Sequence, residues 1–239
     1  MARPETIVVT GASGGIGRAL VEALLERFDE ARIVATYHKA SDLPGHERIS
    51  WRQIDLRDAQ SIEGWSSEFD RVDWILNAAG YLHGEYGGPE KSIRKFDTEF
   101  LIENIRVNTL PTLLLARHFG AALKQSPAPL LASISARVGS IEDNRLGGWY
   151  SYRVSKAALN MALKTLSIEW KHSHPRGCVV ALHPGTNDTA LSKPFQANVD
   201  PEHLFDPAYT ASMFVELLSA LGPEDSGQFR AWNGDVIPW

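Results

Sequence analysis

The chain has 239 residues, of which 44% are hydrophobic and 22% charged, a composition typical of a globular protein. Its net charge of −5 argues against nucleic acid and against an anionic membrane surface as partners, because both contacts need a basic patch. The single cysteine, Cys178, excludes an internal disulfide framework and fits a reducing compartment.

The chain carries no sign of a targeting segment. No run approaches the roughly 18 apolar residues that a membrane span requires. The N-terminal "MARPE" passes directly into the strand-like "TIVVT", which leaves no room for a signal peptide. We therefore expect a cytoplasmic protein.

Short apolar runs rich in β-branched residues recur along the chain and predict strands. They cover residues 6–10, 32–36, 49–54, 72–76, 130–134 and 179–182, with a last short strand at "QFRAW". Helical patterns lie between them, among them residues 17–28, 98–122, 151–170 and about 207–221. Unalternated apolar strands separated by helices indicate a parallel sheet with helices on both faces. Because no repeat or linker divides the chain, we expect one doubly wound α/β domain of the Rossmann type over residues 1–239, with about seven strands.

The first candidate site is the segment "TGASGGIGRAL", directly after the first predicted strand. Gly11, Gly15 and Gly17 stand where the strand turns into a helix, so the backbone can approach a pyrophosphate at the helix start. A plain glycine-rich turn is the alternative. A phosphate-binding Walker loop is excluded, because no Gly-Lys-Ser/Thr sequence follows.

Two further segments fit the same edge of the sheet. "LNAAG" ends the fourth strand, where small residues can let a cofactor pass closely or simply pack under a helix. In "YSYRVSK", only Tyr152 stands four residues before Lys156, so a helix would place these two side chains on one face. A cation near a phenol favours the phenolate, and lowering its pKa by about three units requires roughly 4 kcal/mol. The pair is therefore a candidate for proton transfer, with an ordinary surface pair as the alternative.

These segments together resemble the short-chain dehydrogenase/reductase family, through "TGASGGIG", "NAAG", Asn108, "YRVSK" and "HPGTNDT". The resemblance covers essentially the whole chain. Within the family, "SARVGSIEDNRLGGWYSYRVSKAALN" and the ending "GDVIPW" resemble the subgroup of C-factor signalling proteins and sniffer-like carbonyl reductases. The resemblance implies a Rossmann fold, a nicotinamide cofactor, and Tyr152 as the catalytic acid/base with Lys156 beside it. Asn108 would help hold a water molecule in a proton relay.

The resemblance assigns the cofactor contacts by position. They are Gly11, Ser13, Gly14, Gly15, Ile16 and Gly17; Tyr37, His38 and Lys39; Asp55 and Leu56; Asn77, Ala78, Ala79 and Gly80; Tyr152 and Lys156; and Pro184, Gly185, Thr186 and Thr189. NAD-preferring relatives carry an acidic residue where Tyr37 aligns, and His38 and Lys39 follow here, so NADP(H) is favoured over NAD(H). Asn77 is expected to brace the central strand. The eight histidines show no metal-ligand spacing, so no metal is expected.

The sequence departs from the family at the serine that bonds the substrate carbonyl. In "SISARVG" that position is Ala136, counted back from Gly139. The role is then absent, taken by water, or supplied by Ser135 or, second, by Ser140. Trp149, Tyr150 and Phe195 are candidates for an apolar substrate pocket, and the segment after Thr189 for a lid.

The sequence favours an NAD(P)(H)-dependent oxidoreductase that acts on a small carbonyl or alcohol. A nucleotide-binding signalling protein of the C-factor type with weak turnover is the alternative. A sugar-nucleotide epimerase is disfavoured because no substrate domain follows. Leucine and alanine lie on more than one side of the helices predicted at residues 98–122 and 151–170. Because members of the family that the chain resembles pair these helices across a two-fold axis, the resemblance implies a homo-oligomer, a dimer or a tetramer.

Overall fold

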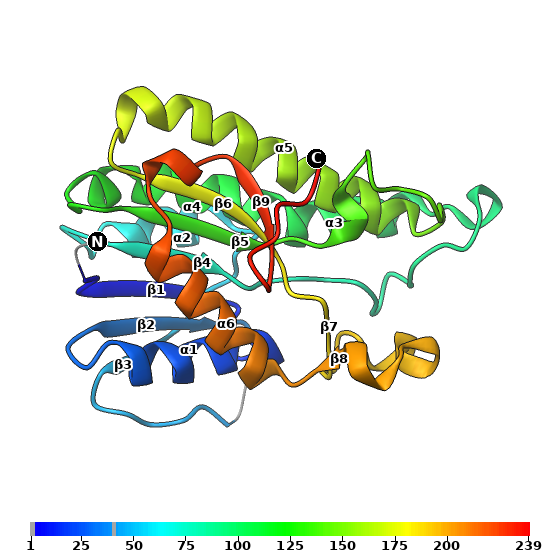
Figure 1. The fold of residues 1–239 in the computed structure, drawn as a ribbon, viewed down its shortest axis with the longest axis horizontal. Coiled ribbons are helices and arrows are strands. Elements are labelled where there is room, and N and C mark those ends of the chain that lie inside the picture. The colour runs from blue at the N-terminus through cyan, green and yellow to red at the C-terminus, as the bar shows by residue number, and fades with distance from the viewer. Residues whose placement is uncertain (1–2, 40–41) are drawn as a thin grey trace.

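One parallel sheet of seven strands forms the centre of the molecule (Figure 1). The computed structural model describes residues 3–39 and 42–239. Its strand order is β3-β2-β1-β4-β5-β6-β9, and every neighbouring pair is parallel. The strands are β1 Thr6–Thr10, β2 Arg32–Tyr37, β3 Ile49–Gln53, β4 Trp74–Asn77, β5 Leu130–Ile134, β6 Cys178–His183 and β9 Gln228–Ala231. The expected seven-stranded α/β fold is confirmed, and the strand order reverses between β1 and β4.

Helices cover both faces of this sheet (Figure 1). Within the described residues they are α1 Gly15–Arg27, α2 Ala59–Ser66, α3 Thr98–Asn108, α4 Leu110–Lys124, α5 Tyr150–Ser173 and α6 Pro207–Ala220. Ile7 and Val9 of β1 join the core under α1 and α6, whereas Val8 joins the core under α2, α4 and α5. Consecutive strand residues thus enter opposite layers, which explains why the strands are apolar without alternation.

The helix predicted over residues 98–122 is two helices. α3 ends at Asn108, and α4 begins at Leu110. Pro111 lacks the N–H that would bond the carbonyl of Val107, so a continuous helix loses a hydrogen bond there. Helix α2 was not predicted, although Asp58 caps its N-terminus through a bond from the Gln60 amide. The break after Asn108 matters for the site, because it places this side chain at a helix end.

The segment after β9 folds back along that strand, which lies at an edge of the sheet. Val236 pairs with Arg230 in an antiparallel bridge, and the Ile237 amide donates to Phe229 O at 2.7 Å. A separate two-stranded parallel pair, β7 Thr186–Asn187 and β8 Leu204–Phe205, follows β6. Within the described part of the chain, no helix is long and apolar enough to cross a membrane.

Candidate active site

The turn between β1 and α1 contains glycines at positions where any side chain would collide with the backbone. Gly11 has a φ of +68°, and a Cβ there would lie 2.6 Å from the Ala79 amide nitrogen. A Cβ on Gly17 would lie 2.2 Å from the carbonyl oxygen of Gly11. Gly14 is the N-cap of α1 and provides no side-chain bond, so the first N–H groups of the helix are left for a ligand. This cradle fits the pyrophosphate of a dinucleotide.

Asn77 holds the point where the strand order reverses. Its side-chain oxygen accepts from Thr10 Oγ1 at 2.8 Å and from the Ala79 amide at 3.1 Å. Its Nδ2 donates to Thr112 Oγ1 at 2.9 Å. Asn77 therefore braces β1, β4 and α4, in the role expected for it, and it fixes the backbone of residues 78–80 beside the glycine turn.

Two adjoining cavities follow the carboxyl ends of the strands. One, of about 350 Å³, is lined by Gly11, Ser13, Tyr37, His38, Asp55 and Leu56 among others. The other, of about 390 Å³, is lined by Gly15, Ile16, Gly17, Ser135, Tyr152, Lys156, Pro184, Gly185, Thr186 and Thr189 among others. Gly14, Ala78, Ala79 and Gly80 line both, so the two cavities meet at these small residues. Of the residues predicted for catalysis or cofactor binding, Lys39, Asn77 and Asn108 line neither cavity, and neither do the further candidates Ser140 and Tyr150.

Arg57 shapes the first of these cavities, and sequence reasoning missed it. Its guanidinium donates to Asp55 Oδ2 at 2.8 Å and to the buried Glu103 at 3.1 Å. The bonds from Arg57 lower the pKa of Asp55 to about 2. The Asp55 carboxylate therefore stays ionised and its charge is paired with that of Arg57. His38 lies 3.8 Å from this carboxylate. The signal was present in "DLRD", where Arg57 follows Asp55 by two positions.

Tyr152 and Lys156 lie together in the second cavity, one turn apart on α5. The Lys156 Nζ lies 5.7 Å from the centre of the Tyr152 ring and donates to the carbonyl oxygen of Ile134 at 2.9 Å. Burial lowers the pKa of Lys156 to about 7 and raises that of Tyr152 above its ordinary value. The second direction is opposite to the one expected from the sequence. A lysine that is only partly protonated near neutral pH offsets little of the desolvation of the phenol.

Asn108 ends α3 and connects three segments. Its Oδ1 accepts from the Tyr81 amide at 2.8 Å, and its Nδ2 lies within 3.0 Å of Tyr81 O and of Ser155 Oγ. Ser155 lies on α5 beside Lys156, so Asn108 ties the loop after β4 to the helix that carries the tyrosine. The part of Asn108 in a water relay stays a prediction.

Neither Ser135 nor Ser140 has a free hydroxyl that could replace the serine missing at position 136, because both make hydrogen bonds to other residues. Ser135 Oγ donates its only proton to Asn160 Oδ1 at 2.6 Å, so it would have to turn from Asn160 to reach a substrate. Ser140 is buried and accepts from the Asp143 amide at 3.0 Å. His183 lines the cavity, and its Nδ1 accepts from the Arg137 amide at 3.2 Å. Burial, assisted by the charge of Arg137, lowers the pKa of His183 to about 4, so its neutral ring carries the proton on Nε2.

An aromatic cluster borders Tyr152. Trp149 lies 6.1 Å from the Tyr152 ring and 5.2 Å from the Phe195 ring, measured between ring centres. Phe195 also contacts His83, at 5.6 Å. Trp149 and Phe195 line the cavity as expected, and Tyr150 is not among the lining residues. His83 was not predicted, and nothing in the sequence around it indicated its place.

Trp149 has an unusual backbone. It is the one non-glycine residue with positive φ in the described part of the chain, with φ 54° and ψ 42°. Such a conformation costs about 1–2 kcal/mol for a residue with a side chain. It follows directly on Gly147 and Gly148, whose φ angles are +64° and +65°. The tight turn sets Trp149 at the N-terminus of α5, three residues before Tyr152.

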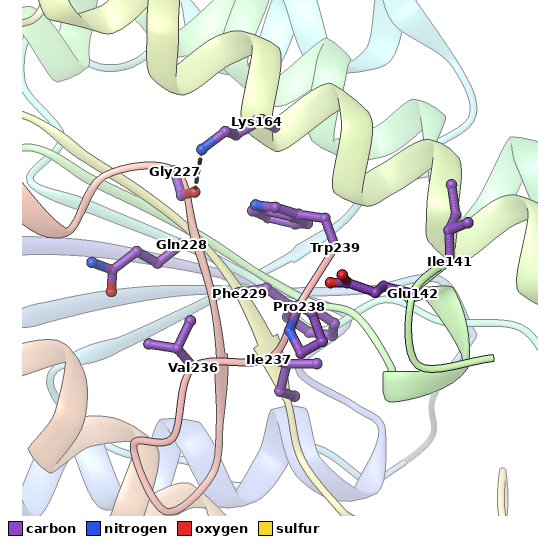
Figure 2. A pocket seen from close by; sticks show the side chains of 10 residues that line it. All are labelled: Ile141, Glu142, Lys164, Gly227, Gln228, Phe229, Val236, Ile237, Pro238 and Trp239. Carbon is purple, nitrogen blue, oxygen red and sulfur yellow. Dashed lines mark hydrogen bonds between the residues drawn. The ribbon is translucent and has the colours of Figure 1, made fainter. Parts of the chain in front are cut away.

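Another hollow lies elsewhere, between α5 and the segment after β9 (Figure 2). Its volume is about 650 Å³, and its wall includes Glu142, Lys164 and Trp239. Lys164 donates to Gly227 O at 3.0 Å and lies 5.7 Å from the Trp239 ring. None of the predicted site residues lines it. The candidate active site is therefore the pair of cavities at the glycine turn.

Comparisons with known proteins agree with this geometry. The family model for short chain dehydrogenase matches residues 5–200. The 1-hydroxy-2-glutathionyl-2-methyl-3-butene dehydrogenase of Rhodococcus sp. (strain AD45) is 28% identical over 98% of this chain and 100% of its own length. The C-signal protein of Myxococcus xanthus is 30% identical over 70% of this chain and 93% of its own length.

Solved structures lead to the same family. The NADPH-bound carbonyl reductase from chicken fatty liver superposes with a TM-score of 0.84 at 25% identity, covering 100% of both chains. The C-signal relative confirms the resemblance to C-factor proteins. The carbonyl reductase Sniffer of D. melanogaster has the same fold, with a TM-score of 0.84 at 23% identity over 99% of this chain and 100% of its own. With its Rossmann sheet, its glycine turn and its Tyr152–Lys156 pair, the chain belongs to the short-chain dehydrogenase/reductase family of NAD(P)-dependent oxidoreductases.

Proposed function

We propose that the protein is an NADP(H)-dependent carbonyl reductase in which Tyr152 is the acid/base. The observation that carries this proposal is that Tyr152 and Lys156 share one cavity with the glycine turn. The Tyr152 hydroxyl makes no hydrogen bond with the other residues that the structure describes, so its proton is available to a ligand in the cavity. The similarity to an NADPH-bound carbonyl reductase supports the same reading.

Cofactor binding and proton transfer are assigned to different residues. The open N–H groups at the start of α1 would hold the pyrophosphate, and the small residues 78–80 would leave room for the nicotinamide half of the cofactor. When bound, the cofactor supplies the hydride that the carbonyl carbon accepts. Tyr152 donates its phenolic proton to the carbonyl oxygen, and in the reverse direction the phenolate takes a proton from the alcohol. Lys156 lies next to the phenol, and its proton favours the phenolate when it is charged.

The choice of NADP(H) rests on the charges near the ribose. Tyr37 stands where an acidic residue would bond the 2′-hydroxyl, and Arg57 engages Asp55, the carboxylate that lines the same cavity near His38. No free carboxylate in the described lining faces a 2′-phosphate at that point. The basic groups proposed for it are His38, which lines the cavity, and Lys39, which follows His38 in the sequence but is not part of the lining.

The expected assembly is a homo-oligomer of single-domain chains in the cytoplasm. Val154, Met161 and Ile168 are exposed at seven-residue intervals along α5. This apolar stripe lies on the side of α5 that the chain itself leaves uncovered, and it fits a helix of a second copy.

The C-signal relative motivates the signalling alternative. The retained Tyr152 and Lys156 favour the enzyme.

The test is a panel of aldehydes, ketones and quinones with NADPH and with NADH, followed by the loss of cofactor absorbance. We expect turnover with NADPH, and titration of protein fluorescence should show tighter binding of NADPH. A tenfold preference for NADH, worth about 1.4 kcal/mol, contradicts the cofactor assignment. Absence of turnover across the panel, together with normal NADPH binding, favours the signalling alternative.

The missing serine has its own test. Removing a donor aimed at a developing oxyanion costs about 2.7–4 kcal/mol in other enzymes, and a compensating group reduces that cost. Ser135 is the first candidate for compensation, so Ser135→Ala should lower turnover at least tenfold with NADPH binding unchanged. If Ser135→Ala is silent and Ala136→Ser raises turnover by orders of magnitude, the native site has no such donor.

A further inference from the structure

The wall formed by Trp149 and Phe195 holds a feature that the proposed reaction does not use. Proton and hydride transfer need Tyr152, Lys156 and a cofactor site, but they do not need an indole beside them. Trp149 is nevertheless held in a left-handed backbone conformation that side chains rarely adopt. A residue kept in such a conformation at a site requires other groups that fix it there, and the chain has them.

The Trp149 backbone is fixed from one side by Glu90. The Trp149 amide donates to the carbonyl oxygen of Glu90 at 2.6 Å. The Glu90 carboxylate, which is 4% exposed, accepts from the Ser151 amide at 3.1 Å and from the Ser151 hydroxyl. A carboxylate is favourable at this place because the N-terminus of α5 carries a partial positive charge. Glu90 thus joins the loop after β4 to the start of the catalytic helix.

Arg153 fixes the same turn from the other side. Its guanidinium donates to Gly148 O at 3.0 Å and to Gly147 O at 3.2 Å, and also to Val138 O at 3.2 Å. The two glycines adopt the positive φ angles without a side chain to oppose them. Glu90 and Arg153 thus hold the turn from two sides, in the conformation that sets the indole against Tyr152 and Phe195.

The surroundings of the two rings are apolar. Leu82, Val138 and Val199 line the same cavity, and no carboxylate is among the described lining residues. The Trp149 and Phe195 rings are inclined by 59° to one another and are both partly exposed. Two inclined aromatic faces favour a third flat apolar group that packs against both, more than they favour a flexible aliphatic chain. A cationic ligand would be attracted here only by the faces of the Trp149 and Phe195 rings. Lys156, which lines the same cavity, would repel such a ligand when the lysine is charged.

We infer that Trp149 and Phe195 form a specificity subsite for uncharged carbonyl compounds that carry an aryl group next to the carbonyl. This inference rests on the proposed function, since it places the carbonyl at Tyr152. The aryl ring of the substrate packs against the Trp149 and Phe195 rings, and its carbonyl oxygen then points toward the hydroxyl of Tyr152, three residues after Trp149. Phe195 belongs to the short helix Lys193–Asn198, so the segment after Thr189 contributes half of the subsite.

The experiment compares an aryl ketone with a short aliphatic aldehyde in three variants. Trp149→Gly keeps the backbone, because glycine adopts this φ without strain, and Trp149→Phe keeps an aromatic ring. We expect Trp149→Gly and Phe195→Ala to lower kcat/KM for the aryl ketone at least tenfold. For the aldehyde we expect a loss of less than threefold. Trp149→Phe should recover most of the aryl activity. An equal loss for both substrates overturns the inference.

A second readout is independent of turnover. Calorimetric titration with benzamide, which is flat, uncharged and not reduced, should show binding to the native protein and at least tenfold weaker binding to Trp149→Gly. Trp239→Phe is the matched control, because Trp239 lines the other hollow, and it should bind benzamide as the native protein does. Benzamide binding that depends on Trp149, without reduction of any carbonyl, supports the subsite and contradicts the proposed function. Reduction of carbonyls with no benzamide binding and no aryl preference overturns the subsite and leaves the proposed function in place.

Discussion

Two helix N-termini border the same site, and the chain treats them in opposite ways. The start of α1 has a glycine N-cap with no side-chain bond, so its N–H groups face the cavity. The start of α5 is filled by the buried carboxylate of Glu90, which accepts from Ser151. The same backbone feature is therefore left open at α1, where we propose that the pyrophosphate binds, and is filled by a carboxylate at α5. The comparison shows that a helix N-terminus can bind an anion only when no side chain already accepts hydrogen bonds from its first N–H groups; glycines at the turn are not sufficient by themselves.

The largest expected effect separates the two tyrosines at the start of α5. Tyr152→Phe should abolish carbonyl reduction with nearly unchanged NADPH affinity, because only the proton donor is lost. Tyr150→Phe should be mild, since Tyr150 does not line the cavity. Steady-state rates and fluorescence titration of both variants check this. Equal losses would show that the start of α5 supports structure and not chemistry.

Gly17→Ala tests the start of α1. The added Cβ would lie 2.2 Å from a backbone oxygen that cannot move away, so we expect a loss of stability of about 3 kcal/mol and loss of NADPH binding. Gly14→Ala is the matched control for stability, because its Cβ would meet no atom closer than 3.4 Å. Urea denaturation measures both. Similar stabilities for the two variants would contradict the steric account of the turn.

Burial of Lys156 makes the stability of the protein depend on pH. Its pKa is lowered to about 7 in the folded protein from an ordinary value of 10.5, so between these values the unfolded chain binds the extra proton. Stability from this residue therefore rises with pH above 7, by up to about 1.4 kcal/mol per pH unit, and is constant below 7. The stability difference between the native protein and Lys156→Met should rise by about 2–3 kcal/mol from pH 7 to pH 9. The exposed Lys171→Met is the control, and a flat difference for Lys156→Met would argue against its burial.

The smallest expected effect concerns the cap itself. Glu90→Ala leaves the Ser151 amide without its partner at the start of α5, and we expect a loss of about 2 kcal/mol together with lower kcat. Asp58→Ala removes the exposed cap residue of helix α2 and should cost about 1 kcal/mol without affecting kcat. Denaturation and rate measurements separate the two. A Glu90→Ala variant with full kcat would show that the cap supports stability alone.

The strand pattern and the glycine motif made most of the fold predictable. Residues 6–10 and 130–134 are strands with the predicted bounds, because buried parallel strands are apolar on both sides. The division at Thr109 was missed, since the apolar pattern continues across it and only Pro111 signals the break.

The candidate site was predictable where a motif depends on local spacing. Tyr152 and Lys156 are four residues apart on one helix, and the sequence alone brings them together. Glu90 was missed because its role depends on Ser151, a partner far along the chain. Arg57 was missed although "DLRD" places it two positions after Asp55, and only its second partner, Glu103, is distant in sequence. The direction of the Tyr152 pKa shift was also missed, since burial is a property of the packed protein and not of the spacing.

The turn that follows β9 has a consequence for how copies of the chain can meet. An edge strand with free N–H and C=O groups is a template on which another chain can add a strand, which leads to aggregation. Here the segment after β9 occupies part of that edge, with the Ile237 amide bonded to Phe229 and the Trp239 ring stacked on the Phe229 ring (Figure 2). The sheet is thereby hindered from growing past β9 into a neighbour. At this edge of the sheet a second copy would therefore find fewer free backbone groups with which to pair.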